Sequence, residues 1–220
     1  MGQNNLRELG KTNSLFNAFL AEMRDIKIQK DRMRFRRNLE RLGEIFAYEI
    51  SKELKYEQRQ VQTPLGIADM WLPESKLVLG LILRAGLPLH QGLLNYFDNA
   101  ENAFISAFRK YGKDNKFTIQ FEYISCPSIE KKTLVLCDPM LATGASMVLA
   151  YNALLERGMP THTHIVAPIA GREGVNHVLK NLPQKHVTLW VGAIDEELTI
   201  KSYIVPGLGD AGDLAYGSKI

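Results

Sequence analysis

Carboxyl and hydroxyl side chains follow one apolar stretch of the chain at short spacing. Residues 134–137 read Leu-Val-Leu-Cys, and the next nine, from Asp138 to Ser146, read Asp-Pro-Met-Leu-Ala-Thr-Gly-Ala-Ser. The hydroxyl groups of Thr143 and Ser146 can donate hydrogen bonds to a phosphate, and Gly144 allows the backbone to approach it closely. Asp138 is itself an anion, so it suits sugar hydroxyls beside the phosphate rather than the phosphate. Together these residue types favour a ribose phosphate as the ligand.

The elements that must hold these side chains are a buried strand and the helix after it. The run from Thr133 to Asp138 is apolar over most of its length, which is typical of a strand covered on both faces. Apolar residues then recur at helical spacing and predict a helix that begins near Gly144. In open parallel sheets ligands bind beyond the carboxyl ends of strands, and the first turn of a helix offers unpaired N–H groups. The pattern therefore predicts an anion site here.

The same loop allows a plainer interpretation. It could be a capped helix start in which Asp138 is only a turn residue, and the residues alone give the two interpretations equal weight. Two nucleotide-binding motifs do not apply. The string Gly-x4-Gly-Lys-Ser/Thr is not found in the chain, and Gly-x-Gly-x-x-Gly is not found after a predicted strand.

The wider pattern alternates strands with helices. Strands are predicted at 77–83, 103–109, 117–123, 133–138, 164–170 and 186–194, with helices at 30–55, 87–97, about 144–157 and 173–182, and a turn at 63–66. Such alternation is typical of βαβ units, so we predict an α/β fold with a mostly parallel sheet. We expect one domain over 1–220, with an N-terminal helical segment at about 14–56 and a core at about 60–220.

Composition places the chain among ordinary globular proteins. Hydrophobic residues make up 45% and charged residues 23%, and the net charge is +3, which supports only a weak preference for anionic ligands. The two cysteines, Cys126 and Cys137, show no metal-type spacing. The N-terminus lacks the apolar stretch of a signal peptide, and no apolar run is long enough for a bilayer. We therefore expect a cytoplasmic protein.

Other charged residues have plain interpretations. An arginine-rich helix face is typical of a solvated surface or a subunit contact; it carries Arg32, Arg34, Arg36, Arg37 and Arg41. His162 and His164 alternate along a predicted strand, so they face the same side, but two residues do not predict a metal site. Taken singly, Arg84 and Arg109 read as surface charges at strand ends, and Asp210 reads as a turn residue between glycines.

Residues 138–146 resemble the phosphoribosyl-pyrophosphate loop of type I phosphoribosyltransferases. Most members have two adjacent acids there, whereas the uracil phosphoribosyltransferases have Asp-Pro, as in Asp138-Pro139. Four further segments resemble that family: the N-terminal helix at 34–50, the pyrophosphate loop LILRAGL at 81–87, the flap segment SAFR at 106–109 and the uracil-recognition segment YIVPGLGDAGD at 203–213. The family more often has glycine where this chain has Ala145, and the added methyl is harmless if φ is negative.

The resemblance implies a fold and a reaction. The fold would be that of type I phosphoribosyltransferases, with a central mostly parallel sheet flanked by helices, a β-hairpin flap or arm and an N-terminal helix. The reaction would transfer the phosphoribosyl group of 5-phosphoribosyl 1-diphosphate to N1 of uracil, giving UMP and diphosphate in pyrimidine salvage. Asp138, Arg84 and Arg109 would be the catalytic residues, with the two arginines stabilising charge on the leaving diphosphate.

The resemblance also implies contact residues and a cofactor. Residues that would bind the sugar diphosphate are Arg84, Arg109, Asp138, Pro139, Met140, Leu141, Ala142, Thr143, Gly144, Ala145, Ser146 and Asp210. Those around uracil would be Tyr203, Ile204, Gly209, Asp210 and Ala211, mostly through their backbone groups. Mg2+ would be held mainly by the substrate, with Asp210 contributing directly or through water. Residues 110–132 and 168–174 differ from the usual family pattern, which bears on flap closure and on how the sheet edge presents the base.

Two alternatives remain beside the interpretation as a uracil phosphoribosyltransferase. One is a phosphoribosyltransferase for another nucleobase. The other is an RNA-binding regulator on the same fold, in which the basic helix at 32–41 contacts phosphates. We expect small-molecule partners, uracil and 5-phosphoribosyl 1-diphosphate, rather than nucleic acid or a membrane, and a homodimer or larger homo-oligomer.

Overall fold

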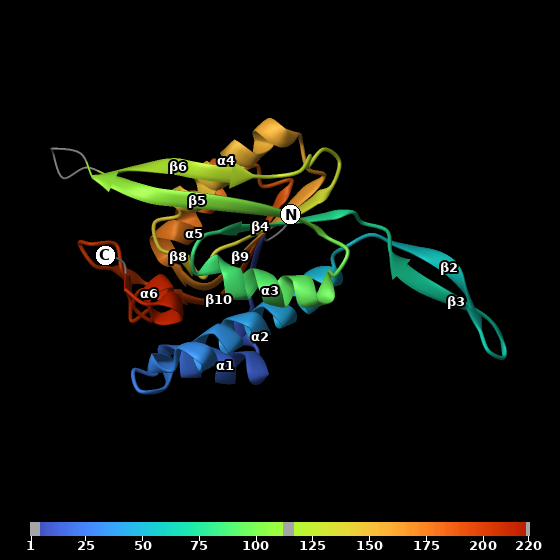
Figure 1. The fold of residues 1–220 in the computed structure, drawn as a ribbon, viewed down its shortest axis with the longest axis horizontal. Helices are drawn as coiled ribbons and strands as arrows, with labels where there is room; N and C mark the ends of the chain where they lie inside the picture. Colours follow the sequence, from blue (N-terminus) through green and yellow to red (C-terminus); the bar gives the residue numbers. More distant parts are fainter. Residues whose placement is uncertain (1–4, 112–116, 219–220) are drawn as a thin grey trace.

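The computed structural model describes residues 5–111 and 117–218, with only the backbone described for 107–111 and 117–122. Its centre is an eight-stranded sheet with the strand order β1-β10-β9-β7-β4-β5-β6, beside which β8 pairs with β9 (Figure 1). Every pairing in this sheet is parallel except that of β5 with β6. The strands are β1 (Leu6–Glu8), β4 (Leu77–Ile82), β5 (Glu101–Tyr111), β6 (Phe117–Ser125), β7 (Thr133–Cys137), β8 (Met140–Leu141), β9 (His162–Gly171) and β10 (Val187–Asp195).

Helices cover both faces of the sheet. On β4, Leu79 and Leu81 pack with the helices α1 (Leu15–Arg24), α2 (Arg32–Ser51) and α3 (Gly86–Tyr96), which lie together below the sheet in Figure 1. Val78 and Ile82 pack on the opposite face with α4 (Ala145–Leu154) and α5 (Arg172–Asn181). This alternation explains why the strand is apolar at every position. The predicted strands and helices of the core are therefore confirmed in type and order.

The N-terminal segment holds two helices rather than one. After the 3-10 turn η1 (Leu9–Lys11), α1 begins at the cap Ser14, whose Oγ accepts from the N–H of Phe16 at 3.2 Å. The turn η2 (Ile28–Lys30) leads to α2, which is capped by Asp31 through the N–H of Arg34 at 3.0 Å. The sequence predicted the longer helix, and the structure ends it at residue 51.

A two-stranded hairpin projects from one end of the molecule. It consists of β2 (Tyr56–Thr63) and β3 (Gly66–Pro73), joined at the predicted turn (Figure 1). The sequence did not predict these strands, because a hairpin with both faces in solvent lacks the apolar alternation of a half-buried strand. Among the described residues no helix is long and apolar enough to cross a bilayer.

The opposite end carries the carboxyl edge of the sheet. Strands β4, β7, β9 and β10 run in the same direction, so their last residues and the loops after them meet there. Beyond β10 the chain forms β11 (Glu197–Leu198), β12 (Ile204–Val205) and the short helix α6 (Ala211–Tyr216), which lies at this end in Figure 1. The turn η3 (Leu155–Arg157) extends α4 to Gly158, whose positive φ ends the helix as predicted.

Candidate functional site

The first half of the loop at 138–146 is fixed to the sheet. The N–H of Asp138 donates to the carbonyl of Val166 at 3.1 Å. Met140 and Leu141 then form β8, which pairs with β9, and the Leu141 side chain is 2% exposed in the core. The segment outside this pairing is 142–146. Because the Leu141 side chain is buried, the predicted contact of Leu141 with a ligand would have to use its backbone.

The second half of the loop opens α4. Gly144 is the N-cap, with a φ of +78°, and the helix starts at Ala145, close to the predicted start. A Cβ atom at Gly144 would lie 2.8 Å from the carbonyl oxygen of Gly174 in α5, and one at Gly174 would lie 2.5 Å from the carbonyl oxygen of Ala142. These two glycines allow the loop and α5 to touch. The methyl of Ala145 is harmless, because this helical residue is not among those with positive φ.

The carboxyl group of Asp138 is in an unusual electrostatic environment. Burial raises its pKa from 3.8 to about 7; the negative charge of Asp210 acts in the same direction, and a hydrogen bond from the N–H of Met140 opposes the rise. Two residues that are 72 positions apart in sequence therefore lie close enough to interact electrostatically. A positive ligand or a hydroxyl donor at this point would favour the charged form of Asp138.

Arg84 lies directly beyond β4 at the same edge. Its Nη2 donates to Asp213 Oδ1 and to the carbonyl of Gly217, both at 3.1 Å. Its Nε is buried and has no hydrogen-bond partner among the described residues. The peptide bond between Leu83 and Arg84 is cis. Arg84 is thus held between the strand end and α6, and it is not the free surface charge of the plain interpretation.

The segment at 203–213 lies close to Arg84 and Asp138, because Asp213 accepts from Arg84 and the charge of Asp210 acts on Asp138. Ile204 is buried in β12, which pairs with β11, whereas Tyr203 is 44% exposed. Gly209 has a φ of +95° and open space around it. Asp210 caps α6 by accepting from the N–H of Asp213 at 3.0 Å, and Ala211 is the first helical residue. The segment therefore offers the side chains of Tyr203 and Asp210 as well as its backbone groups.

One detail of the same segment corrects the sequence analysis. Gly207, Gly209 and Gly212 form a Gly-x-Gly-x-x-Gly string, and it does follow a strand and open a helix. The strand, however, is a two-residue antiparallel piece and the helix has six residues, so the string is not part of a βαβ unit.

Comparisons with known proteins agree with this geometry. The sequence profile of the family described as uracil phosphoribosyltransferase matches residues 11–218. The chain belongs to the uracil phosphoribosyltransferase family. It is 56% identical to the uracil phosphoribosyltransferase of Porphyromonas gingivalis, over 96% of this chain and 98% of that protein. It is 36% identical to that of Pyrococcus furiosus, over 91% and 85%.

A solved structure confirms the predicted fold class. The AQ2163 protein from Aquifex aeolicus superimposes with a TM-score of 0.85 at 30% identity, covering 98% of this chain and 99% of that one. This similarity supports the fold, and the assignment of 138–146 as the sugar-diphosphate loop stays a prediction. The divergent 168–174 turn lies beside that loop, because Gly171 and Gly174 both approach the carbonyl oxygen of Ala142.

The flap of this phosphoribosyltransferase fold is described only in part. Arg109 lies on β5, with its backbone opposite Ile119 of β6, and its side chain is outside the described atoms. Residues 112–116, at the predicted hairpin tip, are outside the described residues as well. The antiparallel pairing of β5 with β6 confirms the predicted hairpin.

Carboxylates at the crevice fit a magnesium ion that arrives with its substrate. Asp138 and Asp210 supply hard oxygen donors, and their mutual repulsion would be relieved by a cation. No group of three His, Cys, Asp or Glu side chains within the described part of the chain could hold a metal alone. The donor set therefore suits Mg2+ that is bound partly by phosphate oxygens and water.

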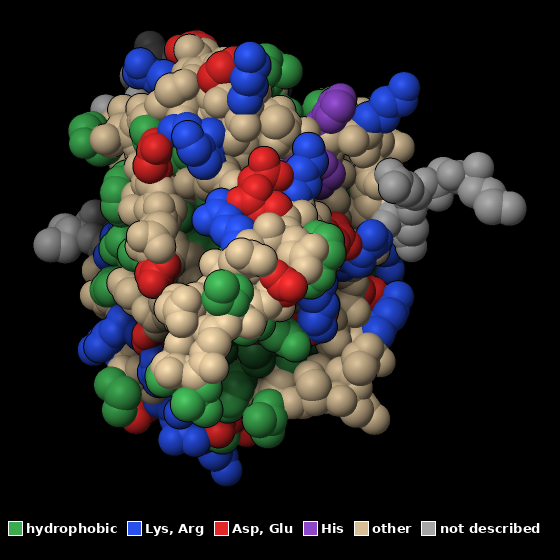
Figure 2. Space-filling model, turned by 90° about the vertical axis from the view of Figure 1, so that its right-hand side faces the viewer, with side chains coloured by type: hydrophobic (Ala, Val, Ile, Leu, Met, Phe, Trp, Pro, Cys, Tyr) green, Lys and Arg blue, Asp and Glu red, His purple; other side chains and the backbone are tan. Residues whose placement is uncertain are grey.

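The arginine-rich face is occupied by contacts within the chain. Arg34 pairs with Glu22, Arg36 donates to the carbonyl of Ala215 at 2.7 Å, and Arg41 lies over the ring of Phe19. These contacts disfavour the RNA-binding alternative, because guanidinium groups that are already engaged are poor phosphate ligands. On the hairpin side of the molecule, which Figure 2 shows, basic and acidic side chains are likewise interspersed without a continuous basic stripe.

The two histidines on β9 are part of the opposite, amino edge. Their rings lie 4.7 Å apart on one face of the sheet, as the alternation predicted. Trp190 Nε1 donates to His164 Nδ1 at 3.0 Å, and burial lowers the pKa of His164 to about 3. The ring is therefore neutral at physiological pH and packs in the core against Trp190.

Sequence reasoning missed three residues at the carboxyl edge. Asp213 accepts a hydrogen bond from Arg84, Gly174 packs against the loop at Ala142, and Asp195 is the last residue of β10. Asp195 could have been found, because it is an acid at the end of a predicted parallel strand, where ligand sites gather. Asp213 and Gly174 carry no such signal.

Proposed function

We propose that this protein transfers the phosphoribosyl group of 5-phosphoribosyl 1-diphosphate to N1 of uracil, giving UMP and diphosphate. The observation that carries the proposal is 56% identity to the uracil phosphoribosyltransferase of Porphyromonas gingivalis, extending over almost the whole of both chains. The crevice at the carboxyl edge supplies the chemistry that this reaction needs, as the next paragraphs describe.

The ribose phosphate would bind at the start of α4. Backbone N–H groups of 143–146 and the positive end of the helix dipole attract the 5′-phosphate, and the hydroxyl groups of Thr143 and Ser146 add donors. Asp138 would accept hydrogen bonds from the ribose hydroxyls. Its ionised form would also stabilise positive charge that develops on the sugar ring in an oxocarbenium-like transition state.

The diphosphate would lie toward Arg84. The unpartnered Nε of Arg84 is a donor that is already desolvated, so a phosphate oxygen there would satisfy it. Arg109 on β5 would reach the same group from the flap. Mg2+, when bound with the substrate, neutralises diphosphate charge and makes it a better leaving group. Asp210 would contribute to holding that ion.

Uracil would bind against the segment at 203–211. Backbone N–H and carbonyl groups near Ile204, Gly209 and Ala211 can match the donor–acceptor pattern of one edge of the base. Cytosine reverses one of those hydrogen bonds and would leave a polar backbone group unpaired, so we expect it to be rejected.

A direct assay tests the proposal. The purified protein is incubated with Mg2+, the sugar diphosphate and labelled uracil, cytosine, xanthine or hypoxanthine, and nucleotide products are separated. We expect UMP from uracil alone and a loss of at least about 100-fold in kcat/KM for D138N. D98N, which alters an exposed carboxyl beyond the end of α3, is the matched control with unchanged activity. A product from another base would change the substrate, and no product from any base would refute the transferase function.

We also propose that the protein is a cytoplasmic homodimer in which the β2–β3 hairpin contacts the second copy. Leu65, Ile67 and Trp71 of the hairpin are 99%, 66% and 65% exposed. An isolated two-stranded hairpin is marginally stable in water, so a projecting one with apolar side chains gains stability when a partner covers it.

A further inference from the structure

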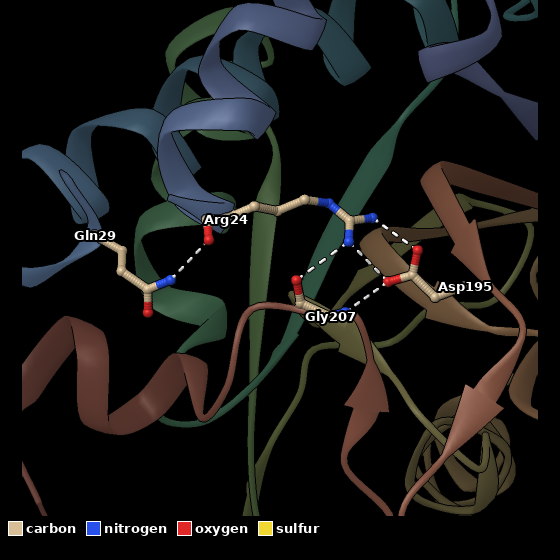
Figure 3. A network of polar contacts seen from close by, with 4 residues as sticks. All are labelled: Arg24, Gln29, Asp195 and Gly207. Carbon is tan, nitrogen blue, oxygen red and sulfur yellow. Dashed lines mark hydrogen bonds and ion pairs between the residues drawn. The ribbon is translucent and has the colours of Figure 1, made fainter. Parts of the chain in front are cut away.

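Arg24 reaches from the end of α1 to the turn that follows β12, and it contacts that turn together with Asp195 (Figure 3). Its Nη1 donates to Asp195 Oδ2 at 2.8 Å, and its Nη2 donates to Asp195 Oδ1 at 2.9 Å. Nη1 also donates to the carbonyl of Gly207 at 3.1 Å. The N–H of Gly207 in turn donates to Asp195 Oδ2 at 2.9 Å. Three sequence segments that are far apart are thus joined by four hydrogen bonds.

These contacts engage both polar backbone groups of Gly207. The residue has a φ of +54°, and a Cβ atom there would lie 2.1 Å from the carbonyl oxygen of Ile204, so the turn is tight. The position of this turn therefore depends on a pair of side chains rather than on a strand ladder alone. Asp195 is well placed for the task because it is the last residue of β10, which is fixed in the sheet.

The ion pair is shielded from solvent. The side chains of Arg24 and Asp195 are 24% and 9% exposed, and the contact between them is bidentate. Charge-assisted hydrogen bonds of this kind are stronger and more directional than exposed ion pairs. Removing Arg24 or Asp195 would leave the other charge poorly solvated. It would also free the turn, since the carbonyl of Gly207 accepts from Arg24 and its N–H donates to Asp195.

We propose that Arg24 and Asp195 are positioning residues that fix the base-recognition segment and so set the affinity and selectivity for uracil. The inference rests on the proposed function, in which backbone groups on either side of Gly207 bind the base. Hydrogen bonds from a backbone lose strength quickly when distance or angle changes, so the location of the turn decides how well Ile204 and Gly209 meet uracil. The 5′-phosphate and ribose contacts at α4 would not depend on it.

A matched ion pair on the same helix provides the control. Glu22 of α1 accepts from Arg34 Nε at 2.9 Å and from Arg34 Nη2 at 2.7 Å, which is also bidentate, but Arg34 lies on α2 and does not contact the turn. R24M and R34M therefore each remove one bidentate arginine–carboxylate pair that involves α1. Only R24M releases Gly207.

The kinetic test compares KM values for the two substrates. For R24M we expect the KM for uracil to rise about 10- to 100-fold, the KM for the sugar diphosphate to change less than about 3-fold, and discrimination against cytosine to weaken. R24K retains the charge and can keep one contact, so its uracil affinity should lie between those of R24M and the wild type. A purely structural role would not require this order. R34M should match the wild type in both KM values. Equal changes in both KM values for R24M would overturn the proposal.

Hydrogen exchange supplies a readout that does not depend on activity. In R24M the amides of 203–211 should exchange at least about 10-fold faster, while those of β9 and β10 keep wild-type rates. D195N preserves the shape of the acceptor and gives the same comparison if R24M fails to fold. Unchanged exchange in 203–211 would overturn the claim that Arg24 and Asp195 hold the turn in place. Faster exchange with an unchanged KM for uracil would overturn its role in recognition, whereas absence of UMP formation by the wild type would refute the proposed function instead.

Discussion

Asp138 is the residue whose charge state matters most in the crevice. Its raised pKa, about 7, means that the carboxyl is partly protonated near neutral pH when no ligand is bound. A bound sugar with its magnesium ion brings hydroxyl donors and positive charge, and both favour the ionised form. In the proposed complex Asp138 would therefore be charged, whereas in the free protein its burial comes at a cost to stability.

That cost predicts a gain in stability on substitution. The folded pKa lies above 3.8, so the contribution of Asp138 to stability is fully present below about pH 4 and is lost as the pH rises through 7. The difference in free energy of unfolding, D138N minus wild type, should therefore increase by about 1–3 kcal/mol from pH 5 to pH 8. This magnitude has been reduced to allow for the partial exposure of the residue. Urea unfolding at both pH values measures this, with D98N as the control. A constant difference would contradict it.

The sequence indicated candidate site residues better than the contacts that support them. Asp138, Thr143 and Ser146 could be proposed because they follow a buried strand and their chemistry is local. The contact of Arg84 with Asp213 joins residues 129 positions apart. It was not predictable, since neither residue differs in type or local pattern from an ordinary surface charge.

Among the elements, the junction of α4 with α5 determines the shape of the loop that we propose as the phosphate site. The loop reaches its place because Gly144 and Gly174 let backbone touch backbone. Glycine at position 174, within the first turn of α5, is unfavourable for helix formation, which indicates that close approach is the stronger requirement there. The glycine pair thus links the sheet edge to the start of α4.

Substituting alanine for Gly174 separates these two effects. Helix propensity alone would stabilise G174A by about 1 kcal/mol. The added Cβ would lie 2.5 Å from the carbonyl oxygen of Ala142, so we expect destabilisation by about 1–3 kcal/mol and a rise in the KM for the sugar diphosphate. Thermal unfolding and steady-state kinetics measure both. N176A, at an exposed position of the same helix, is the control and should be neutral or slightly stabilising. A more stable G174A would contradict the packing.

Elements that lack a regular pattern escaped sequence reasoning. The core strands and helices were predicted because burial imposes apolar runs and helical periods. Strands β11 and β12 have two residues each and α6 has six, which is too short for a period to be read. Their positions come from long-range contacts such as those between Asp195 and Gly207.

At the scale of the whole molecule, the candidate site and the hairpin lie far apart. The helix α6 lies toward one end of the long axis, and the β2–β3 hairpin extends from the other (Figure 1). Figure 2 views the molecule from the hairpin side, where hydrophobic side chains lie among charged ones. A partner bound through the hairpin would therefore lie away from the proposed substrate site.

Solution mass tests the proposed role of the hairpin. W71E places a charge on a residue that is 65% exposed, and it should shift a dimer toward monomer, by at least about 10-fold in dissociation constant. I26K alters a residue of similar exposure, 73%, in the connection between α1 and α2. It should leave the mass unchanged. Light scattering or sedimentation distinguishes the cases, and a W71E protein that dimerises like wild type would contradict the assignment.

The most direct test of the account is a crystal structure with 5-phosphoribosyl 1-diphosphate and Mg2+ bound and uracil absent. We predict that the 5′-phosphate oxygens lie within about 3.2 Å of backbone nitrogens of 143–146, and that the ribose hydroxyls donate to Asp138. Sugar density elsewhere on the molecule, or a crevice that stays filled by side chains of the protein itself at saturating ligand, would contradict it.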